Sequence, residues 1–159
     1  MDAFTARFNQ ALVTTYRSIL KVEEVMLRDL SGGNLTISEM HILESIGKSR
    51  GEGMHISDIA QEQGITLPSV TMAVKKLEKK GYVTKVKNAS DARRVCVYLT
   101  EPGRRAEIAH RYFHRKMVKA ITRPMTQEER ELMLSGLDRL NAFLAETVAR
   151  RDQAEDSGE

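Results

Sequence analysis

The spacing of apolar residues changes from a helical to an alternating pattern within residues 57–100, and this change constrains the fold most strongly. Ser57 is expected to cap a short helix that Gly64 ends, because serine is a common helix N-cap and glycine a common stop. Thr66 follows at once and is expected to cap a second helix, which runs to the residue before Gly81. Two helices joined by a tight glycine turn have the spacing of a helix-turn-helix.

The alternating pattern begins directly after the second of these helices. Residues 82–86 and residues 94–100 alternate as strands, and the polar residues 87–93 lie between them as a hairpin loop. A hairpin that follows a helix-turn-helix in this way is a wing. The sequence therefore predicts a winged helix-turn-helix.

Longer helical segments flank this predicted lobe. Residues 3–30 show a helical period, and "TISE" at residues 36–39 fits a capping box before another helix, which ends near Gly47. Helices are also expected from Glu101 to about Arg123 and, after a second capping box, up to about residue 150, with a frayed tail beyond. The predicted fold class is mostly α: a single domain over 1–159, with a DNA-binding lobe at 36–100 and dimerisation helices at 1–30 and 101–150.

The helix after Thr66 has two different faces. Val70, Ala73, Val74 and Leu77 share an inner apolar stripe, whereas small groups and lysines occupy the rest of its surface. Such a helix suits the major groove of DNA. The candidate DNA contacts on and before this helix are Thr66, Pro68, Ser69, Thr71, Met72, Lys75 and Lys76.

Basic residues are concentrated around the predicted wing. Residues 75–105 contain ten basic and three acidic residues, a net charge of +7, whereas the rest of the chain has 15 basic and 19 acidic residues, a net charge of −4. This asymmetry indicates a polyanionic partner. A solvated charged face is the alternative interpretation of the pattern.

Two stretches resemble the MarR family of winged-helix repressors. They are "ITLPSVTMAVKKLEKKGYVTK" and "DARRVCVYLT", the second of which has the family's Asp-x-Arg pattern followed by alternating apolar residues and Leu-Thr. The resemblance covers about residues 3–148. It implies that Arg93 enters the minor groove and that Asp91 orients its guanidinium group, with Lys87 and Arg94 as further wing contacts. A planar, permanently charged arginine suits a narrow groove of strong negative potential.

The start of the predicted recognition helix offers no Arg, Asn or Gln to the DNA bases. The two-pronged hydrogen bonds to guanine and adenine are therefore absent there. Pro68, Thr71 and Met72 can instead contact thymine methyl groups, while Lys75 and Lys76 bind phosphates. Together with the preference of Arg93 for a narrow minor groove, this pattern predicts an A·T-rich operator that is read partly by its shape.

The terminal helices carry more apolar residues than a small winged lobe can cover. Phe4, Phe8 and Leu12 near one end, and Leu137, Phe143 and Leu144 near the other, need a partner surface. Packing on each other within one chain is one possibility. The family resemblance implies the other, an intertwined homodimer, whose two-fold axis predicts an inverted-repeat operator in double-stranded DNA.

Two kinds of effector fit the sequence. "SEMHILESIGK" and "HRYFHRKMV" resemble the branch of the family that represses fatty-acid synthesis genes, in which a long-chain acyl group on acyl carrier protein is the co-repressor. An acyl chain would then lie among apolar residues of the first, second and fifth helices, for which ordinary core packing is the alternative. The candidate lining residues are Ile19, Val22, Met26, Met40, Phe113 and Met117, with Ile46 and Tyr82 beside them.

The second kind of effector is a zinc ion. His110 and His114 are four residues apart on one helix, a spacing that can hold one metal ion. With Glu23 and His41 they match the ligand positions of the zinc-sensing branch. The alternative is histidines bonded to a neighbouring glutamate or carbonyl group. A DNA-binding protein without any effector is a third possibility.

Other functions find little support in the sequence. Nucleophile elbows and phosphate-binding or dinucleotide-binding glycine loops are absent, so an enzyme is not expected. The lack of a long apolar run argues against a membrane protein, and the single cysteine, Cys96, suits a reducing cytoplasm. Cys96 is expected to be an ordinary strand residue, and His55 a structural one.

Overall fold

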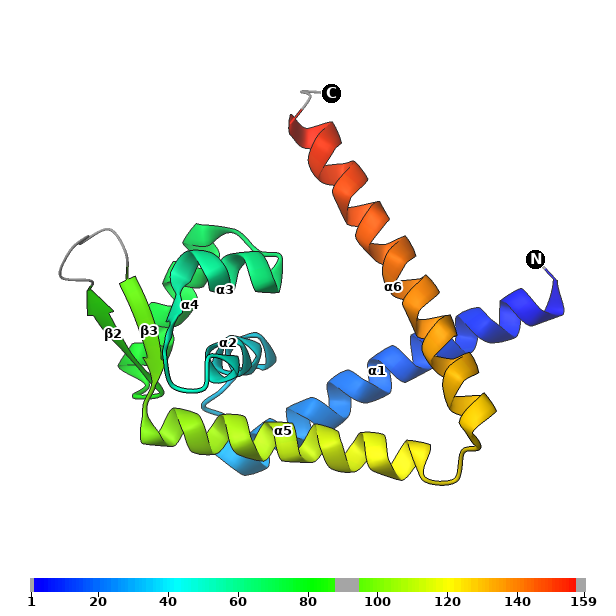
Figure 1. Cartoon of the computed structure of the whole chain (residues 1–159), viewed down its shortest axis with the longest axis horizontal. Coiled ribbons are helices and arrows are strands. Elements are labelled where there is room, and N and C mark those ends of the chain that lie inside the picture. The colour runs from blue at the N-terminus through cyan, green and yellow to red at the C-terminus, as the bar shows by residue number, and fades with distance from the viewer. Residues whose placement is uncertain (1, 88–94, 157–159) are drawn as a thin grey trace. The chain divides into compact units, whose positions relative to one another are not determined.

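The computed structural model describes residues 2–87 and 95–156, with the side chains of residues 2–86 and 95–150. The chain divides into two compact units, Met1–Phe113 and His114–Glu159. Figure 1 shows the order of the elements along the chain, coloured from blue to red. Within the described residues, the first unit holds four complete helices, the initial part of the long helix α5 and a small sheet.

The first two helices begin and end as the sequence predicts. Helix α1 spans Ala3–Ser31 and ends at Gly32, whose φ of 60° is a left-handed conformation that glycine adopts without strain. Helix α2 spans Ile37–Lys48. Its capping box is complete, because Thr36 Oγ1 accepts the N–H of Glu39 at 3.2 Å and the Glu39 carboxylate accepts the N–H of Thr36 at 3.0 Å.

The helix-turn-helix consists of α3, Ile56–Gln63, and α4, Leu67–Lys79. Gly64 ends α3 with a φ of 62°, as predicted. The prediction that Ser57 caps α3 was wrong, because His55 occupies the N-cap position and the Ser57 hydroxyl donates to Asp58 Oδ1 instead. The physical reason is that a short strand precedes α3 without a linker, so the helix begins one residue before Ser57.

That short strand, β1, spans Met54–His55 and belongs to a three-stranded sheet with the order β1-β3-β2. Strands β2, Val83–Lys87, and β3, Val95–Leu99, form the predicted antiparallel hairpin. Val97 lies at the middle of β3 and is fully buried, with Val95 and Leu99 partly buried on the same face. The sequence predicted this alternation, but β1 was not predicted.

The core of the first unit lies mainly within the winged lobe. Its buried residues come from α2, α3, α4 and the sheet, together with Leu27 of α1, Leu35 between α1 and α2, and Ala106 of α5. Figure 1 shows α2, α3 and α4 grouped beside the strands. The recognition helix is therefore held by the same apolar cluster that holds the sheet.

Helix α5 spans Glu101–Thr122, and its first turn lies close against Tyr82, the residue just before β2. Thr100 caps it as predicted, since its Oγ1 accepts the N–H of Gly103 at 3.3 Å. Helix α6, Gln127–Asp156, follows a second capping box between Thr126 and Glu129. A frayed tail was predicted from residue 150 onward. This prediction was wrong for residues 150–156, because their backbone belongs to helix α6.

Candidate DNA-binding surface

Helix α4 is fixed on one side by complete burial of its apolar stripe. Val70, Val74 and Leu77 have no exposed surface, and Ala73 is partly buried beside them. The start of the helix is fixed by Thr66, whose Oγ1 accepts the N–H of Ser69 at 3.4 Å and lies 2.9 Å from its hydroxyl. The inner face that the sequence predicted is thus confirmed.

The remaining faces of α4 are open to solvent. All seven candidate DNA contacts of this region are exposed, and Met72 keeps 56% of its surface accessible. The Thr71 hydroxyl donates to Leu67 O at 2.8 Å, so its hydrogen is engaged by the backbone and its methyl group remains for contact. The surface therefore offers small, mostly apolar groups flanked by lysines, rather than amide or guanidinium groups.

A long-range ion pair holds the end of α4 against the start of α2. Lys80 is the C-cap of α4, and its Nζ lies 2.8 and 2.7 Å from the two carboxylate oxygens of Glu39. Burial of Glu39 opposes its ionisation, but hydrogen bonds from Lys80 and Thr36 and the charge of Lys80 outweigh that effect, so the pKa of Glu39 lies below its ordinary value. The orientation of α4 is therefore linked to that of α2.

The wing is attached to α4 by a second ion pair. Lys85 of β2 lies 2.7 Å from Glu78 of α4. Lys87 is the last residue of β2 and pairs with Val95, but its side chain is not described. The predicted wing contacts Asp91, Arg93 and Arg94 lie outside the described residues.

The predicted metal ligands are brought together in part. Glu23 and His110 are both buried, and a ligand atom of one lies within 4.8 Å of a ligand atom of the other. His114 follows His110 by one turn of α5. His41 lies near His110 with the ring centroids 6.3 Å apart, but it is not part of the compact group of possible ligands among the described residues.

His110 also contacts a glutamate, which is what the alternative to a metal site predicted for these histidines. Its Nδ1 atom lies 2.6 Å from Glu44 Oε1, which joins α5 to α2 across 66 residues of sequence. Because the His110 side chain is buried, this contact fixes the orientation of its ring. The same contact is compatible with a metal site, since metal-binding histidines are commonly oriented by a carboxylate on the other ring nitrogen.

The candidate acyl-lining residues occupy different environments. Met40 has no exposed surface and belongs to the core, and Met26 packs against that core. Ile19 and Val22 are more than 40% exposed on α1. Phe113 is partly buried at the end of the first unit, and Met117 is partly buried in the second. The burial of Met40 and Met26 therefore fits ordinary core packing as well as the lining of an acyl-binding site.

Comparison with known proteins identifies the family. The MarR family model matches residues 34–94, the segment that contains α2, the helix-turn-helix and the start of the wing. The structure of FabT from Streptococcus pneumoniae in complex with DNA is 35% identical to this chain. The match covers 90% of this chain and 99% of the FabT chain, with a TM-score of 0.83. The chain belongs to the MarR family.

Two further matches agree with this assignment. The MepR–DNA complex of S. aureus shares the fold with a TM-score of 0.71, at 21% identity over 86% of this chain and 97% of that one. YhjH of Bacillus subtilis, an uncharacterised HTH-type transcriptional regulator, is 27% identical over 86 residues, 54% of this chain. Those residues are 48% of YhjH, so the match spans about half the length of that relative.

This MarR-family chain is a DNA-binding transcriptional regulator and not an enzyme. The winged helix-turn-helix predicted from the sequence is thereby confirmed as the fold. Within the described residues, no helix combines the length and the apolar character that a membrane crossing requires.

Sequence reasoning missed the residues that position the surface. Glu39 was singled out only as a capping residue, and its partner Lys80 only as the end of a helix. Glu78 and Lys85 were seen only as charges. The basic segment of residues 75–105 contains Glu78 and Lys85, but its composition did not indicate that they pair, and Glu39 lies outside that segment.

Proposed function

We propose that this MarR-family regulator is a repressor that binds an inverted-repeat operator as a homodimer. Helix α4 would lie in the major groove and Arg93 in the minor groove. The observation that carries the proposal is the division of α4 into a fully buried stripe of Val70, Val74 and Leu77 and an exposed face of small groups and lysines. A helix held this firmly can offer the exposed face to DNA with little ordering cost.

The operator is proposed to be rich in A·T base pairs. The start of α4 has no Arg, Asn or Gln to form paired hydrogen bonds with guanine or adenine, and the Thr71 hydroxyl already donates to Leu67 O. Contact with thymine methyl groups by Met72 and Thr71 is the readout that remains. Selection of bound duplexes from a random pool by the purified protein tests this proposal. An A·T-rich inverted repeat is expected, and a G·C-rich consensus would rule out this mode of reading.

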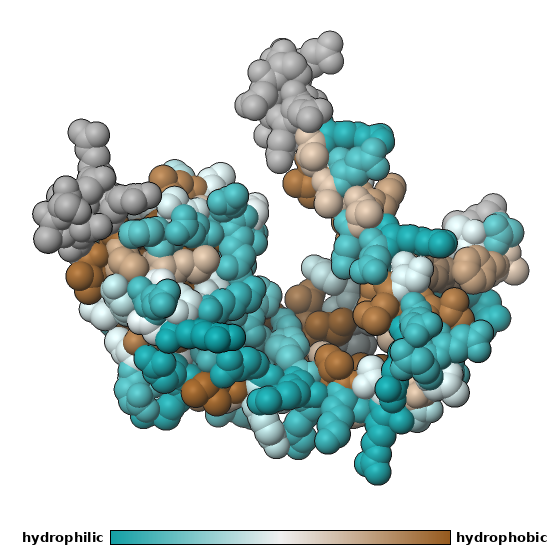
Figure 2. All heavy atoms as spheres, viewed as in Figure 1, coloured by the Kyte–Doolittle hydropathy of each residue, from teal (hydrophilic) through white to brown (hydrophobic). Residues whose placement is uncertain are grey.

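The dimer is proposed from the exposed apolar residues of each unit. On α1, residues such as Phe4, Phe8 and Tyr16 are more than half exposed, and Phe4 and Phe8 stack at 6.1 Å. On α6, Leu132, Leu134 and Phe143 are at least 60% exposed. Figure 2 shows hydrophobic residues, in brown, at the surface of these helices. Exposed apolar surface on this scale is typical of an interface, and a second copy of the chain is the partner we propose.

The effector is proposed to be a long-chain acyl group carried on acyl carrier protein, with fatty-acid synthesis genes as targets. Two sequence stretches resemble that branch of the family, and the likeness to FabT over 90% of the chain supports the same branch. Met26 of α1 packs against the core that contains Met40 of α2, and an adaptable thioether side chain there could yield to an acyl chain.

A zinc-responsive regulator is the second candidate. Buried Glu23 and His110 have ligand atoms within 4.8 Å of each other, and His114 follows one turn later, which gives a nitrogen and oxygen donor set that suits zinc. Glu44 would orient the His110 ring. Zinc bound there would join α1 to α5.

One experiment separates the candidates. Operator affinity of the purified protein is measured by fluorescence anisotropy with zinc, with a chelator, and with long-chain acyl carrier protein. Tighter binding with acyl carrier protein alone supports the acyl effector. Operator binding that weakens after chelation and recovers when zinc is added supports the zinc regulator. The His110→Ala variant should then show no such response to zinc. If zinc, the chelator and acyl carrier protein all leave the operator affinity unchanged, the chain is a DNA-binding protein without either effector.

A further inference from the structure

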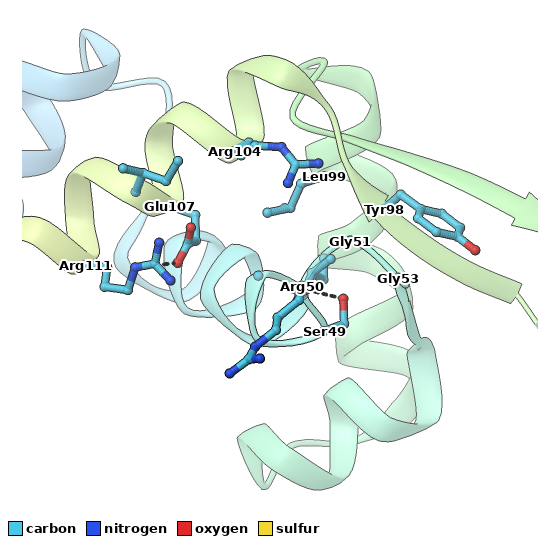
Figure 3. Close-up of a pocket in the computed structure, with 12 residues that line it drawn as sticks. Ser49, Arg50, Gly51, Gly53, Tyr98, Leu99, Arg104, Glu107 and Arg111 are labelled. Atoms are coloured by element: carbon cyan, nitrogen blue, oxygen red, sulfur yellow. Dashed lines mark hydrogen bonds and ion pairs between the residues drawn. The ribbon is translucent and has the colours of Figure 1, made fainter.

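A polar pocket lies on the winged lobe, away from the residues considered above as DNA contacts or effector ligands. It is bordered by the end of α2, the loop of residues 49–53, the end of β3 and the exposed side of α5. Its volume is about 240 Å³. Arg104 and Arg111 of α5 and Arg50 of the loop are among its lining residues, and Figure 3 shows the elements that carry them.

The pocket has an excess of positive charge. Three arginines and one glutamate line it, which gives a net charge of +2. Glu107 is buried and pairs with Arg111, whose Nε lies 3.4 Å from Glu107 Oε1. Among the described residues, Arg50 and Arg104 form no ion pair. Two guanidinium groups at the pocket are therefore not neutralised by any acid in the described part of the chain.

The backbone of Arg50 is held in an unfavourable conformation. Its φ is 54°, and no other non-glycine residue in the described part of the chain has a positive φ. Such a conformation costs roughly 1 kcal/mol for a residue with a side chain, and glycine or asparagine would be easier to accommodate there. The turn is nevertheless well ordered by hydrogen bonds from Arg50 N to Gly47 O at 3.2 Å and from Glu52 N to Ser49 O at 3.1 Å. Because Arg50 lines the pocket in spite of this unfavourable backbone conformation, we infer that its side chain has a function there.

Apolar side chains also line the pocket. They include Leu99 and Ile108, and Tyr98 is a further lining residue. Ile108 is 47% exposed although its neighbours on the helix, Ala106 and Glu107, are buried. The pocket therefore combines an anion-binding rim with a surface that favours an organic group.

We propose that this pocket binds a small phosphomonoester whose organic part is apolar. A phosphomonoester carries close to two negative charges near neutral pH, which matches the net charge of +2, whereas a carboxylate or a phosphodiester carries one. Arginine pairs with phosphate oxygens through two parallel N–H groups, and Arg50 and Arg104 supply such groups. The pocket is somewhat smaller than the roughly 300 Å³ at which drug-sized sites begin, so the ligand is a small metabolite.

Isothermal titration calorimetry with phenyl phosphate tests the proposal. We expect phenyl phosphate to bind about tenfold more tightly than benzoate, which has the same ring and one charge, or than inorganic phosphate, which has no ring. Arg104→Gln and Arg50→Asn should each lower the affinity about tenfold, because each removes a charged hydrogen-bond donor. Asparagine tolerates the left-handed conformation, so Arg50→Asn should unfold at the same or a higher temperature than the parent.

Arg105→Gln is the matched control, because Arg105 is exposed on the same helix, pairs with Glu101 and does not line the pocket. It should bind phenyl phosphate as the parent does. Absence of binding at millimolar phenyl phosphate, or equal affinity in the parent, Arg104→Gln and Arg50→Asn, would overturn the proposal. It would also fail if Arg104→Gln reduced the salt dependence of operator binding, because Arg104 would then be a DNA phosphate contact. Operator binding without phenyl phosphate should be unchanged in all three variants, so this test is independent of the proposed repressor function.

Discussion

The ammonium group of Lys80 lies 2.7 Å from Oε2 and 2.8 Å from Oε1 of Glu39, and the same carboxylate accepts the N–H of Thr36 at 3.0 Å. One buried carboxylate thus closes the first turn of α2 and anchors the C-cap residue of α4. Because Lys80 and Glu39 are 41 residues apart, the pair forms only when the lobe has folded.

The Glu39 carboxylate should make stability depend on pH. Its pKa lies below the ordinary value of glutamate in the folded chain, so its contribution is present above that ordinary value and is lost as the pH falls through the lowered one. Glu39→Gln keeps the acceptor for Thr36 and removes the charge. Urea unfolding should show a loss of about 1–3 kcal/mol for this variant at neutral pH, and a smaller loss below about pH 4. An equal loss at both pH values would contradict the role assigned to the charge.

The two faces of α4 should respond differently to truncation. Leu77 has no exposed surface, so Leu77→Ala should lower the free energy of unfolding by about 2–5 kcal/mol. Met72 is 56% exposed, so Met72→Ala should change that energy by less than about 0.5 kcal/mol but weaken operator binding roughly tenfold. Chemical denaturation and fluorescence anisotropy measure the two quantities. Unchanged operator affinity in Met72→Ala would remove this residue from the proposed interface.

Gly103 is required by the close approach of α5 to the backbone of Tyr82, the residue just before β2. A Cβ atom added there would lie 2.0 Å from the backbone oxygen of Tyr82, which cannot move freely because it accepts the N–H of Thr100. Gly103→Ala should therefore destabilise the first unit by about 3 kcal/mol. Gly136→Ala in α6 is the control, since no atom lies within 4 Å of its added Cβ and alanine is the better helix former. Thermal unfolding should show a lower midpoint only for Gly103→Ala.

The proposed dimer should depend on the apolar stripe of α6. Leu137 is 49% exposed, and Leu137→Glu would place a charge in the interface. Sedimentation velocity should show a shift toward monomer for this variant. Ser135→Glu adds the same charge about 160° away around the helix and should leave the dimer intact. A parent protein that is monomeric at micromolar concentration would contradict the proposal itself.

Local signals in the sequence were sufficient to predict most of the helices and the main hairpin. Thr36, Thr66 and Thr126 each lie where a capping residue is needed, and the stripe of α4 follows directly from its period. Strand β1 could not be predicted, because two residues show no alternation and Met54 and His55 become a strand only by pairing with β3. The error at Ser57 follows from the same cause.

Interactions between distant segments could not be predicted from local patterns. The partner of His110 could be named only as a class, a glutamate or a carbonyl group, because Glu44 lies 66 residues away in the sequence. The pocket beside Arg104 requires the loop of residues 49–53 to meet α5, which is likewise a property of the folded lobe. The wing residues Asp91 and Arg93 stay a prediction, since they lie outside the described residues.

The most direct test of the proposed DNA-binding mode is the affinity of Arg93→Ala for the selected operator. The variant should keep the circular dichroism spectrum and thermal midpoint of the parent and bind about 10–100-fold more weakly, because it loses one charged contact in the minor groove. Arg105→Ala, which removes an exposed arginine paired with Glu101, should bind as the parent does. If Arg93→Ala folds normally and holds the operator as tightly as the parent, the proposed insertion of the wing arginine is contradicted.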